Sequence, residues 1–446
     1  MNALTTLLAF LVTLGVLIVI HELGHYWAAR RCGVRVLRFS IGFGRPLWKG
    51  VYGADRTEWV VAAIPLGGFV RMLDERDPDV DPRLLADLSR AFNRQPVARR
   101  IAIVLAGPVA NLLLAVGVYW WINVSGTLEP RSVLAAPAAE SIAARAGIAA
   151  GDEVVAIDGR PVRAYSDVRW RILERAVDRA EVELTVRAGA GSERTLRLDL
   201  AALGPGEIDH TVFPRIGLAL AEPQPVARQL TADGAAALAG LRPGDRFIAI
   251  DGEPMESSRD VSRVVRAAAG RDLAVVIERA GARQSLSLRP ATVQVEGETI
   301  GRIGVDFRDL VEVRYGPFES VGLAVTRTWD TALFSLRMLG KMITGEASWR
   351  NLSGPVTIAD YAGQTARIGA VAYLSFLALV SISLGVLNLL PIPMLDGGHL
   401  LYYLIEVFKG SPPADWVVEW GQRAGIGVLV MLTALALYND FTRLLA

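Results

Sequence analysis

Three residues near the start of the chain have the types and the spacing of a zinc hydrolase site. His21, Glu22 and His25 form the pattern H-E-x-x-H directly after an uncharged apolar run from Leu4 to Ile20. On a helix the two histidines lie one turn apart on the same face, so both imidazoles can bind one Zn²⁺. Glu22 lies beside them and can take a proton from the attacking water. The pattern predicts metal-assisted hydrolysis, and its position predicts that this hydrolysis occurs inside a bilayer.

A catalytic zinc also needs a third protein ligand and an open position for water or substrate. At the end of a later apolar stretch, residues 388–399 have the sequence NLLPIPMLDGGH, in which two prolines break a helix. Asp396 is the carboxylate of this segment, and it could bind zinc or could cap a helix from His399 to Phe408. The spacing leaves both Asp396 and His399 as candidate ligands. His210 is excluded because it falls in a segment that we expect to be exported.

The composition is that of a membrane protein with soluble parts. Of the 446 residues 52% are apolar and 21% are charged, so the chain is neither one apolar bundle nor one compact soluble core. The net charge of +1 gives no bulk attraction to nucleic acid, and we expect no nucleic-acid partner. The single cysteine, Cys32, excludes an intrachain disulfide.

Four apolar stretches are candidates to cross a membrane: Leu4 to about Ala29, Ile101 to Val124, Ile368 to Leu390, and Ala424 to about Tyr438. The first lacks a cationic region and a small-residue cleavage site, so we interpret it as a retained helix rather than a signal peptide. Basic residues gather between the first two stretches: Arg30, Arg31, Arg35, Arg38, Arg45, Lys49, Arg94, Arg99 and Arg100. The positive-inside rule therefore predicts that residues 30–100 are cytoplasmic, and that both termini and residues 125–366 lie outside.

The segment expected outside contains an internal repeat. Residues 144–162 match residues 237–255 at a constant offset of 93, with ten identities in nineteen positions, which indicates two homologous domains. Each copy has a Gly-Asp turn, a β-branched strand and an Asp-Gly hairpin turn, and an amphipathic helix follows at 168–176 or at 261–268. The pattern resembles the PDZ domains of bacterial envelope proteases, whose sheet edge accepts extended peptides. Polypeptide recognition is the functional interpretation, and a role as spacers is the alternative.

A second β signal lies in the segment expected in the cytoplasm. Residues 57–72 have the pattern of a strand, a glycine turn at Pro65–Gly68 and a second strand, apolar enough to enter the membrane. An open strand edge at that depth needs protein or substrate to cover it. Because a helical substrate hides its amides, an edge that pairs with the substrate would expose them to hydrolysis. A purely structural hairpin is the alternative. Residues 82–100 predict a helix that lies on the inner leaflet.

In their order and spacing these motifs resemble the site-2 protease family of intramembrane zinc metalloproteases, over nearly the whole chain. The motifs that carry the resemblance are HELGH at 21–25, ARRCGV at 29–34 with FSIGFG at 39–44, IPLGG at 64–68, AGPVAN at 106–111, the PDZ-like pair, LSGPVTIA at 352–359, and NLLPIPMLDGG at 388–398.

The resemblance implies roles for particular residues. The implied zinc ligands are His21, His25 and Asp396. It implies that Glu22 is the general base and that Asn388 assists substrate handling. The hairpin would bind substrate through Trp59, Val60, Val61, Gly67, Gly68 and Phe69. The chain departs from the family at Ser383, near which relatives often carry a second asparagine, so a second asparagine contact is not expected.

The resemblance also implies substrates and a location. Family substrates are single-pass membrane proteins already shortened outside by a site-1-type envelope protease, notably anti-sigma factors, together with remnant signal peptides. We therefore expect a multi-pass protein of the bacterial inner membrane, acting within the lipid bilayer, with its repeat domains and both termini in the periplasm.

The predicted fold class is a polytopic α-helical membrane protein of four transmembrane helices, with a membrane-associated β-hairpin and two exported α+β PDZ domains. The expected domains are residues 1–125 with the zinc motif and the hairpin, residues 126–213 and 214–309 as the two PDZ domains, and residues 310–446 with interfacial helices, two spans and the third ligand.

Three alternative kinds of protein would each share part of this pattern. A PDZ-bearing scaffold or chaperone would have the repeat, but it needs no zinc motif in a span. A membrane zinc protease with a glutamate as third ligand would have the motif at residues 21–25, but it would not predict paired PDZ domains. A protein with two structural histidines on a buried helix would leave three ionisable groups at membrane depth, at a cost of several kcal/mol, without a role.

Overall fold

The computed structural model describes residues 3–77, 80, 88–189, 191–204, 211–295 and 297–445, which form two compact units. The helical unit contains residues 2–127 and 314–446, and the repeat unit contains residues 128–313.

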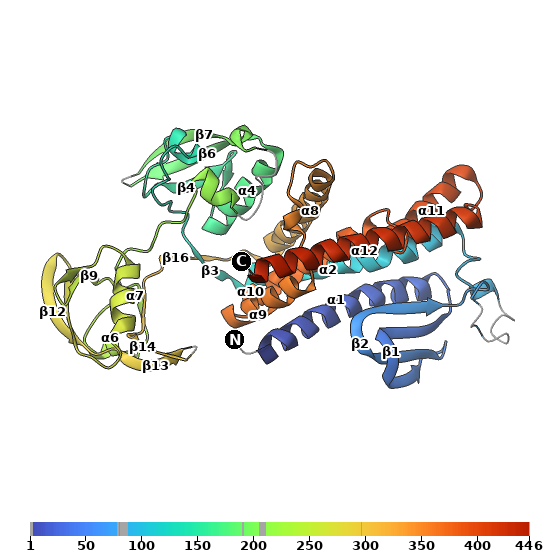
Figure 1. The fold of residues 1–446 in the computed structure, drawn as a ribbon, viewed down its shortest axis with the longest axis horizontal. Coiled ribbons are helices and arrows are strands. Elements are labelled where there is room, and N and C mark those ends of the chain that lie inside the picture. The colour runs from blue at the N-terminus through green and yellow to red at the C-terminus, as the bar shows by residue number, and fades with distance from the viewer. Residues whose placement is uncertain are drawn as a thin grey trace. The chain divides into compact units, whose positions relative to one another are not determined.

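Four helices in the described part of the helical unit are long and apolar enough to cross a membrane. They are α1 (Ala3–Arg31), α2 (Val97–Ser125), α10 (Ala370–Leu389) and α12 (Asp415–Leu445). These helices coincide with the four stretches predicted from the sequence. Helix α2 packs against both α1 and α10 (Figure 1), so it is the element that joins the first zinc motif to the later spans.

The helical unit contains further helices: α8 (Pro317–Ile343), the 3₁₀ turn η4 (Trp349–Asn351), α9 (Pro355–Ile368) and α11 (Asp396–Lys409). Helix α9 packs against α1 and α12. The backbone N–H groups at the N-terminus of a helix have no partner within the helix. For α9, the Asp440 carboxylate of α12 accepts hydrogen bonds from two of them, the N–H groups of Gly354 and Val356, each at 2.9 Å. This cap explains a carboxylate that is almost completely buried in an apolar helix.

Strands β1 (Val36–Tyr52) and β2 (Thr57–Met72) form an irregular antiparallel sheet that packs against α1. The tight turn between them lies at residues 53–56, where Gly53 and Arg56 have φ of +79° and +54°. The structure assigns Thr57–Met72 to one continuous strand. Residues 39–41 of β1 nevertheless pair with residues 59–61 and also, in the reverse order, with residues 70–68. The chain therefore reverses direction between the two halves of β2, as the predicted turn at Pro65–Gly68 requires.

The expected surface helix over residues 82–100 was wrong in its described part. Residues 82–87 lie outside the described residues, Leu88–Arg90 form a 3₁₀ turn (η2), and residues 91–96 are not helical. Pro96 disfavours a helical conformation at the residue before it and is the N-cap of α2, so the helix begins at Val97 instead. The loop is tied back by Arg94, whose guanidinium donates to Glu75 at 2.8 Å.

The repeat unit contains two copies of one four-stranded antiparallel arrangement. The first consists of β4 (Glu153–Ile157), β5 (Arg160–Pro161), α4 (Tyr165–Asp178), β6 (Glu181–Ala188) and β7 (Ser192–Asp199), in the sheet order β5-β4-β6-β7. The second consists of β9 (Arg246–Ile250), β10 (Glu253–Pro254), α7 (Ser258–Ala267), β11 (Leu273–Arg279) and β12 (Ala282–Leu288), in the order β10-β9-β11-β12. The sequence offset of 93 is thus an offset between equivalent strands.

Shorter elements complete the repeat unit: β3 (Thr127–Pro130), α3 (Ile142–Arg145), η3 (Leu200–Ala202), α5 (Val212–Ile216), β8 (Gln229–Leu230), α6 (Ala235–Leu238), β13 (Ala291–Val295), β14 (Glu298–Arg302), β15 (Val305–Asp306) and β16 (Leu310–Val313).

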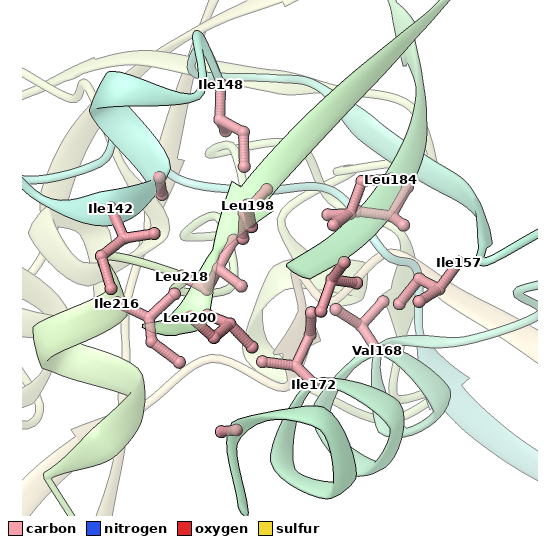
Figure 2. Close-up of a cluster of buried hydrophobic side chains, with 14 of the residues drawn as sticks. Ile142, Ile148, Ile157, Val168, Ile172, Leu184, Leu198, Leu200, Ile216 and Leu218 are labelled. Carbon is pink, nitrogen blue, oxygen red and sulfur yellow. The ribbon is translucent and has the colours of Figure 1, made fainter. Parts of the chain in front are cut away.

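Each repeat encloses its own apolar core. In the first, Val168 and Ile172 lie one turn apart on α4 and face Leu184 and Leu198 of the sheet (Figure 2). The predicted amphipathic helix therefore buries its apolar stripe against the sheet. In the second, Phe247 is fully buried in the equivalent core.

The Gly-Asp turn of each repeat fixes an inward-facing carboxylate. Asp152 and Asp245 are 2% and 1% exposed, and each pairs with an arginine of its own sheet, Arg194 at 2.5 Å and Arg279 at 2.6 Å. Burial opposes the charge of Asp245, but hydrogen bonds from Arg279 and from the Arg242 N–H outweigh it and keep its pKa below the usual value. The shared Gly-Asp motif is therefore accounted for by the fold of each domain.

Candidate active site

Helices α1 and α11 bring three potential metal ligands together in the helical unit. His21 and His25 come from α1 and are 9% and 8% exposed, and Asp396 is the first residue of α11. Asp396 Oδ2 lies 3.2 Å from His21 Nε2 and 3.4 Å from His25 Nε2, and the two Nε2 atoms are 3.2 Å apart. Among the described residues, this is the only such group close enough to hold one metal ion.

The triangle of ligand atoms fits a tetrahedral zinc ion. Zinc binds nitrogen and oxygen ligands at about 2.0–2.1 Å, and tetrahedral angles then place neighbouring ligand atoms roughly 3.3–3.4 Å apart. The three separations of 3.2, 3.2 and 3.4 Å are close to this requirement. Asp396 Oδ2 is also buried without a well-directed hydrogen bond among the described residues, as expected for a lone pair that points at a cation. The residues present therefore fit zinc.

The backbone of α2 fixes the orientation of one imidazole. His25 Nδ1 lies 2.8 Å from the carbonyl oxygen of Ile103. A carbonyl can only accept a hydrogen bond, so Nδ1 carries the proton and Nε2 presents its lone pair to the other two ligand atoms. This is the tautomer that binds a metal through Nε2.

Two glycines allow α1 and α2 to approach closely at the site. A Cβ atom on Gly24 would lie 2.3 Å from the carbonyl oxygen of Ala106, and a Cβ on Gly107 would lie 2.3 Å from His25 Nε2. Neither approach is sterically possible with a larger residue. Gly24 therefore sets the distance between the helices, and Gly107 leaves room for the two imidazoles.

We expect Gly107→Ala to weaken zinc binding, because its methyl group would displace the His25 ring from the ligand triangle. Loss of a residue that hydrogen-bonds to a metal ligand lowers metal affinity roughly 10- to 100-fold. Displacement of the ligand itself should lower the zinc affinity at least as much. Competition with a chromophoric chelator in detergent-purified protein measures the affinity. Gly117→Ala is the matched control on the same helix, since nothing lies within 4 Å of its Cβ position. Equal affinities for both variants would refute the steric role of Gly107.

The loop before α11 determines which of its residues reaches the site. Met394 has φ of +90°, a strained value for a residue with a side chain. Gly397 and Gly398 are buried against the preceding loop, where Cβ atoms would lie 2.1 Å from Leu390 O and 2.5 Å from Ile392 O. The N-cap of α11 is Leu395, without a side-chain cap, so Asp396 does not have the capping role that was its alternative.

His399, the other candidate ligand, follows Asp396 on α11 and lines the same cavity, but its nitrogens are not part of the ligand group. His210 lies outside the described residues. Helix α11 is anchored to α2 by Arg100, whose guanidinium binds both oxygens of Glu406, at 2.6 and 3.1 Å. This mostly buried pair ties the helix that carries Asp396 to the helix that positions the imidazoles.

The ligand group lies in a cavity of about 640 Å³ in the helical unit. Its wall includes Glu22, the C-terminal part of β2 from Gly67 to Met72, and Asn388. Four of the seven residues expected to bind substrate thus line it: Gly67, Gly68, Phe69 and Asn388. Gly68 lies close to the catalytic motif, since its Cβ would be 3.0 Å from Glu22 Cγ.

The other three expected substrate residues do not line this cavity. Trp59 packs against Phe39, with ring centroids 4.5 Å apart and the ring planes tilted by 31°, and belongs to the core between the sheet and α1. Val60 is buried and Val61 is exposed. Only the end of β2 therefore borders the cavity, whereas its start packs elsewhere. Ser383 donates its hydroxyl to Leu379 O of its own helix at 3.0 Å and does not line the cavity either.

Sequence reasoning assigned no role to Gly107, Asn111 or the pair Arg100–Glu406. The segment AGPVAN was noted only as a motif. An asparagine inside an apolar span was the available signal, but the sequence does not say that it is buried or which side chain it meets.

Comparison with known proteins shows the family of the chain. The pattern of peptidase family M50 matches residues 9–432. The chain belongs to peptidase family M50. The regulator of sigma-E protease RseP of Escherichia coli is 42% identical to this M50 peptidase over all of both chains, and a Ralstonia nicotianae protein named as a zinc metalloprotease is 45% identical over 98% of each. Protease RseP of Yersinia pestis is 41% identical over all of both chains. This M50 peptidase is therefore an RseP-like zinc metalloprotease of the site-2 type.

Among solved structures, the PDZ domain of an SdrC-like protein from Listeria monocytogenes resembles 21% of the M50 peptidase, with 20% identity and a TM-score of 0.17.

Proposed function

We propose that this M50 peptidase holds its zinc with His21, His25 and Asp396 and hydrolyses peptide bonds within membrane-spanning segments, with Glu22 as general base. The observation that carries the proposal is the convergence of three ligand atoms at tetrahedral separations, in a cavity that Glu22 also lines. The ligands come from two helices near opposite ends of the chain. Helix α1 is apolar enough to span a bilayer, and α11 follows α10, which is also apolar enough.

Each residue of the proposed site has a distinct task. The bound zinc supplies a Lewis acid. Glu22 accepts the proton of the attacking water and can return it to the leaving amine, because its carboxylate lines the cavity beside the ligands. Asn388 has an amide that can hydrogen-bond to a substrate backbone in the same cavity.

The proposed substrates are single-pass membrane proteins, in particular an anti-sigma factor shortened beforehand by a site-1-type envelope protease, and remnant signal peptides. The named regulators of sigma-E protease among the relatives support this assignment. Initial cleavage rates of full-length and shortened anti-sigma factor, reconstituted with the chain, test it. Faster cleavage of the full-length form would contradict it.

We propose that the substrate pairs with the end of β2. Within the described part of the chain, residues 68–70 pair only with β1, opposite Ile41, Ser40 and Phe39, and they line the cavity. A substrate that paired with the opposite edge of these residues would be extended, so its peptide bonds would be accessible and its amides would not form helical hydrogen bonds. The edge would thus both bind the substrate and unwind it.

Cysteine cross-linking tests this pairing. In a Cys32→Ser, Glu22→Gln chain, Phe69→Cys should form a disulfide with a cysteine in the spanning segment of a trapped substrate. Trp48→Cys is the control, since Trp48 is half exposed in β1 and lies outside the cavity. Cross-linking at position 48 but not at 69 would show that the substrate binds elsewhere on the sheet.

We also propose that the repeat domains are exported PDZ domains and that the β1–β2 sheet is cytoplasmic. The positive-inside bias of the first loop supports this orientation. In a Cys32→Ser chain, Ser192→Cys in the first repeat should react with a membrane-impermeant thiol reagent in intact spheroplasts. Ala54→Cys, at the exposed turn between β1 and β2, should react only after lysis. The opposite labelling would invert the topology.

A further inference from the structure

Asn111 lies beside the proposed zinc site but is not one of the three metal ligands. It lies on α2 one turn after Gly107 and is fully buried. Its side-chain nitrogen lies 3.3 Å from His21 Nδ1, and its side-chain oxygen is buried without a partner among the described residues. An amide in an apolar helix is costly to bury, so a contact with the metal-binding imidazole is a functional candidate.

Both imidazoles must be in the same tautomer to bind zinc. Each must present a lone pair at Nε2, and each must therefore carry its proton at Nδ1. For His25 the acceptor of this proton is the Ile103 carbonyl, 2.8 Å away. For His21 the only side chain or backbone group recorded at Nδ1 in the described part of the chain is the amide of Asn111.

The orientation of that amide decides the tautomer. With the NH₂ group toward the ring, His21 Nδ1 would have to accept, and the proton would sit on Nε2, among atoms that converge on the metal position. The oxygen and nitrogen of an amide are nearly equal in size, so rotation by 180° places Oδ1 at the same point without other movement. Oδ1 then accepts the Nδ1 proton and leaves Nε2 free for zinc.

We propose that Asn111 is a positioning residue that accepts a hydrogen bond from His21 Nδ1 through its side-chain oxygen and thereby holds His21 in its zinc-binding tautomer. Helix α2 would then orient both imidazoles, one through a backbone carbonyl and one through a side chain. The main chain of Asn111 is itself fixed, since its carbonyl accepts a hydrogen bond from Ser381 of α10 at 2.7 Å. The inference rests on the proposed zinc site.

Three variants of the full chain test the proposal, with zinc affinity measured in detergent by chelator competition. Asn111→Leu keeps the size and removes the acceptor, so zinc binding should weaken about 10- to 100-fold. Asn111→Asp has an acceptor in either orientation and should keep the parent affinity. Thr328→Val is the control for loss of a buried polar group, since the Thr328 hydroxyl is buried without a partner among the described residues. It should leave zinc affinity unchanged, and thermal unfolding should be similar for all variants.

The outcomes separate this inference from the site on which it rests. Equal weakening by Asn111→Asp and Asn111→Leu would mean that the amide donates to the ring, and an unchanged affinity in Asn111→Leu would mean that it does not position the ring. Either result overturns the proposal. His21→Ala serves as the reference: if it binds zinc as tightly as the parent, the proposed zinc site fails. If it loses zinc while Asn111→Leu does not, only the role of Asn111 fails.

Discussion

Replacing Glu22 by glutamine is expected to stop peptide hydrolysis while zinc stays bound. The amide keeps the shape of the side chain but cannot accept the proton of the attacking water, and loss of a general base costs about 10²- to 10⁴-fold in rate. Glu22 is not part of the ligand triangle, so zinc affinity should remain that of the parent chain. Initial rates with a reconstituted single-pass substrate, together with zinc content, measure both effects.

Asp74→Asn is the control for Glu22→Gln. Asp74 is another carboxylate of the cavity wall, and it is outside the ligand group. It should keep most of the activity. Full activity in Glu22→Gln would exclude Glu22 as the base, and loss of zinc in that variant would make Glu22 part of the metal site instead.

Replacing Asp396 by asparagine is expected to lower zinc affinity more than any change outside the ligand triangle. A neutral amide oxygen is a weaker ligand than a carboxylate, and the two imidazoles alone leave zinc with too few protein ligands. Loss of a residue that hydrogen-bonds to a metal ligand lowers metal affinity about 10- to 100-fold, so loss of the ligand Asp396 should lower zinc affinity by more than roughly 100-fold. Activity should fall with the zinc content and should return only partly when zinc is added in excess.

His399→Ala is the matched control, because His399 lies on the same helix and lines the same cavity. Its zinc affinity should be close to that of the parent. If His399→Ala lost zinc while Asp396→Asn retained it, the two residues would exchange roles and the ligand triangle would not be the metal site.

Local patterns in the sequence predicted the elements whose structure is decided within a few residues. The spacing of His21 and His25 places them on one helical face in any helix, and the repeat at an offset of 93 specifies the same turn, strand and helix twice. The four spans followed from apolar length alone. These features need no knowledge of the packing.

The errors lie where distant segments decide the structure. The sequence predicted the Pro-Leu-Gly-Gly turn, but it did not predict that residues 59–61 and 68–70 pair with the same residues 39–41 of β1. The same pairing makes Trp59 an inner residue and leaves only the end of β2 at the cavity. Residues 91–96 do not form the expected surface helix, and α2 begins only after Pro96. Tertiary pairing decided which residues of β2 reach the cavity, and a proline overrode the local helix preference before α2.

The third ligand shows the same limit. Asp396 and His399 could not be separated by spacing, because both follow the broken helix within a few residues. The strained φ of Met394 and the close packing of Gly397 and Gly398 turn Asp396 toward the histidines. The partner of Asn111 was equally hidden, since it depends on the approach of α1 to α2 at Gly24.

Locating the bond that the zinc-loaded chain hydrolyses tests intramembrane cleavage most directly. The chain and a shortened single-pass substrate would be reconstituted in liposomes, and the new termini would be identified by mass spectrometry, before and after removal of zinc by a chelator. We expect new termini within the membrane-spanning segment of the substrate, lost on chelation and absent in His21→Ala. Termini found only outside that segment, or cleavage that persists in His21→Ala, would contradict it.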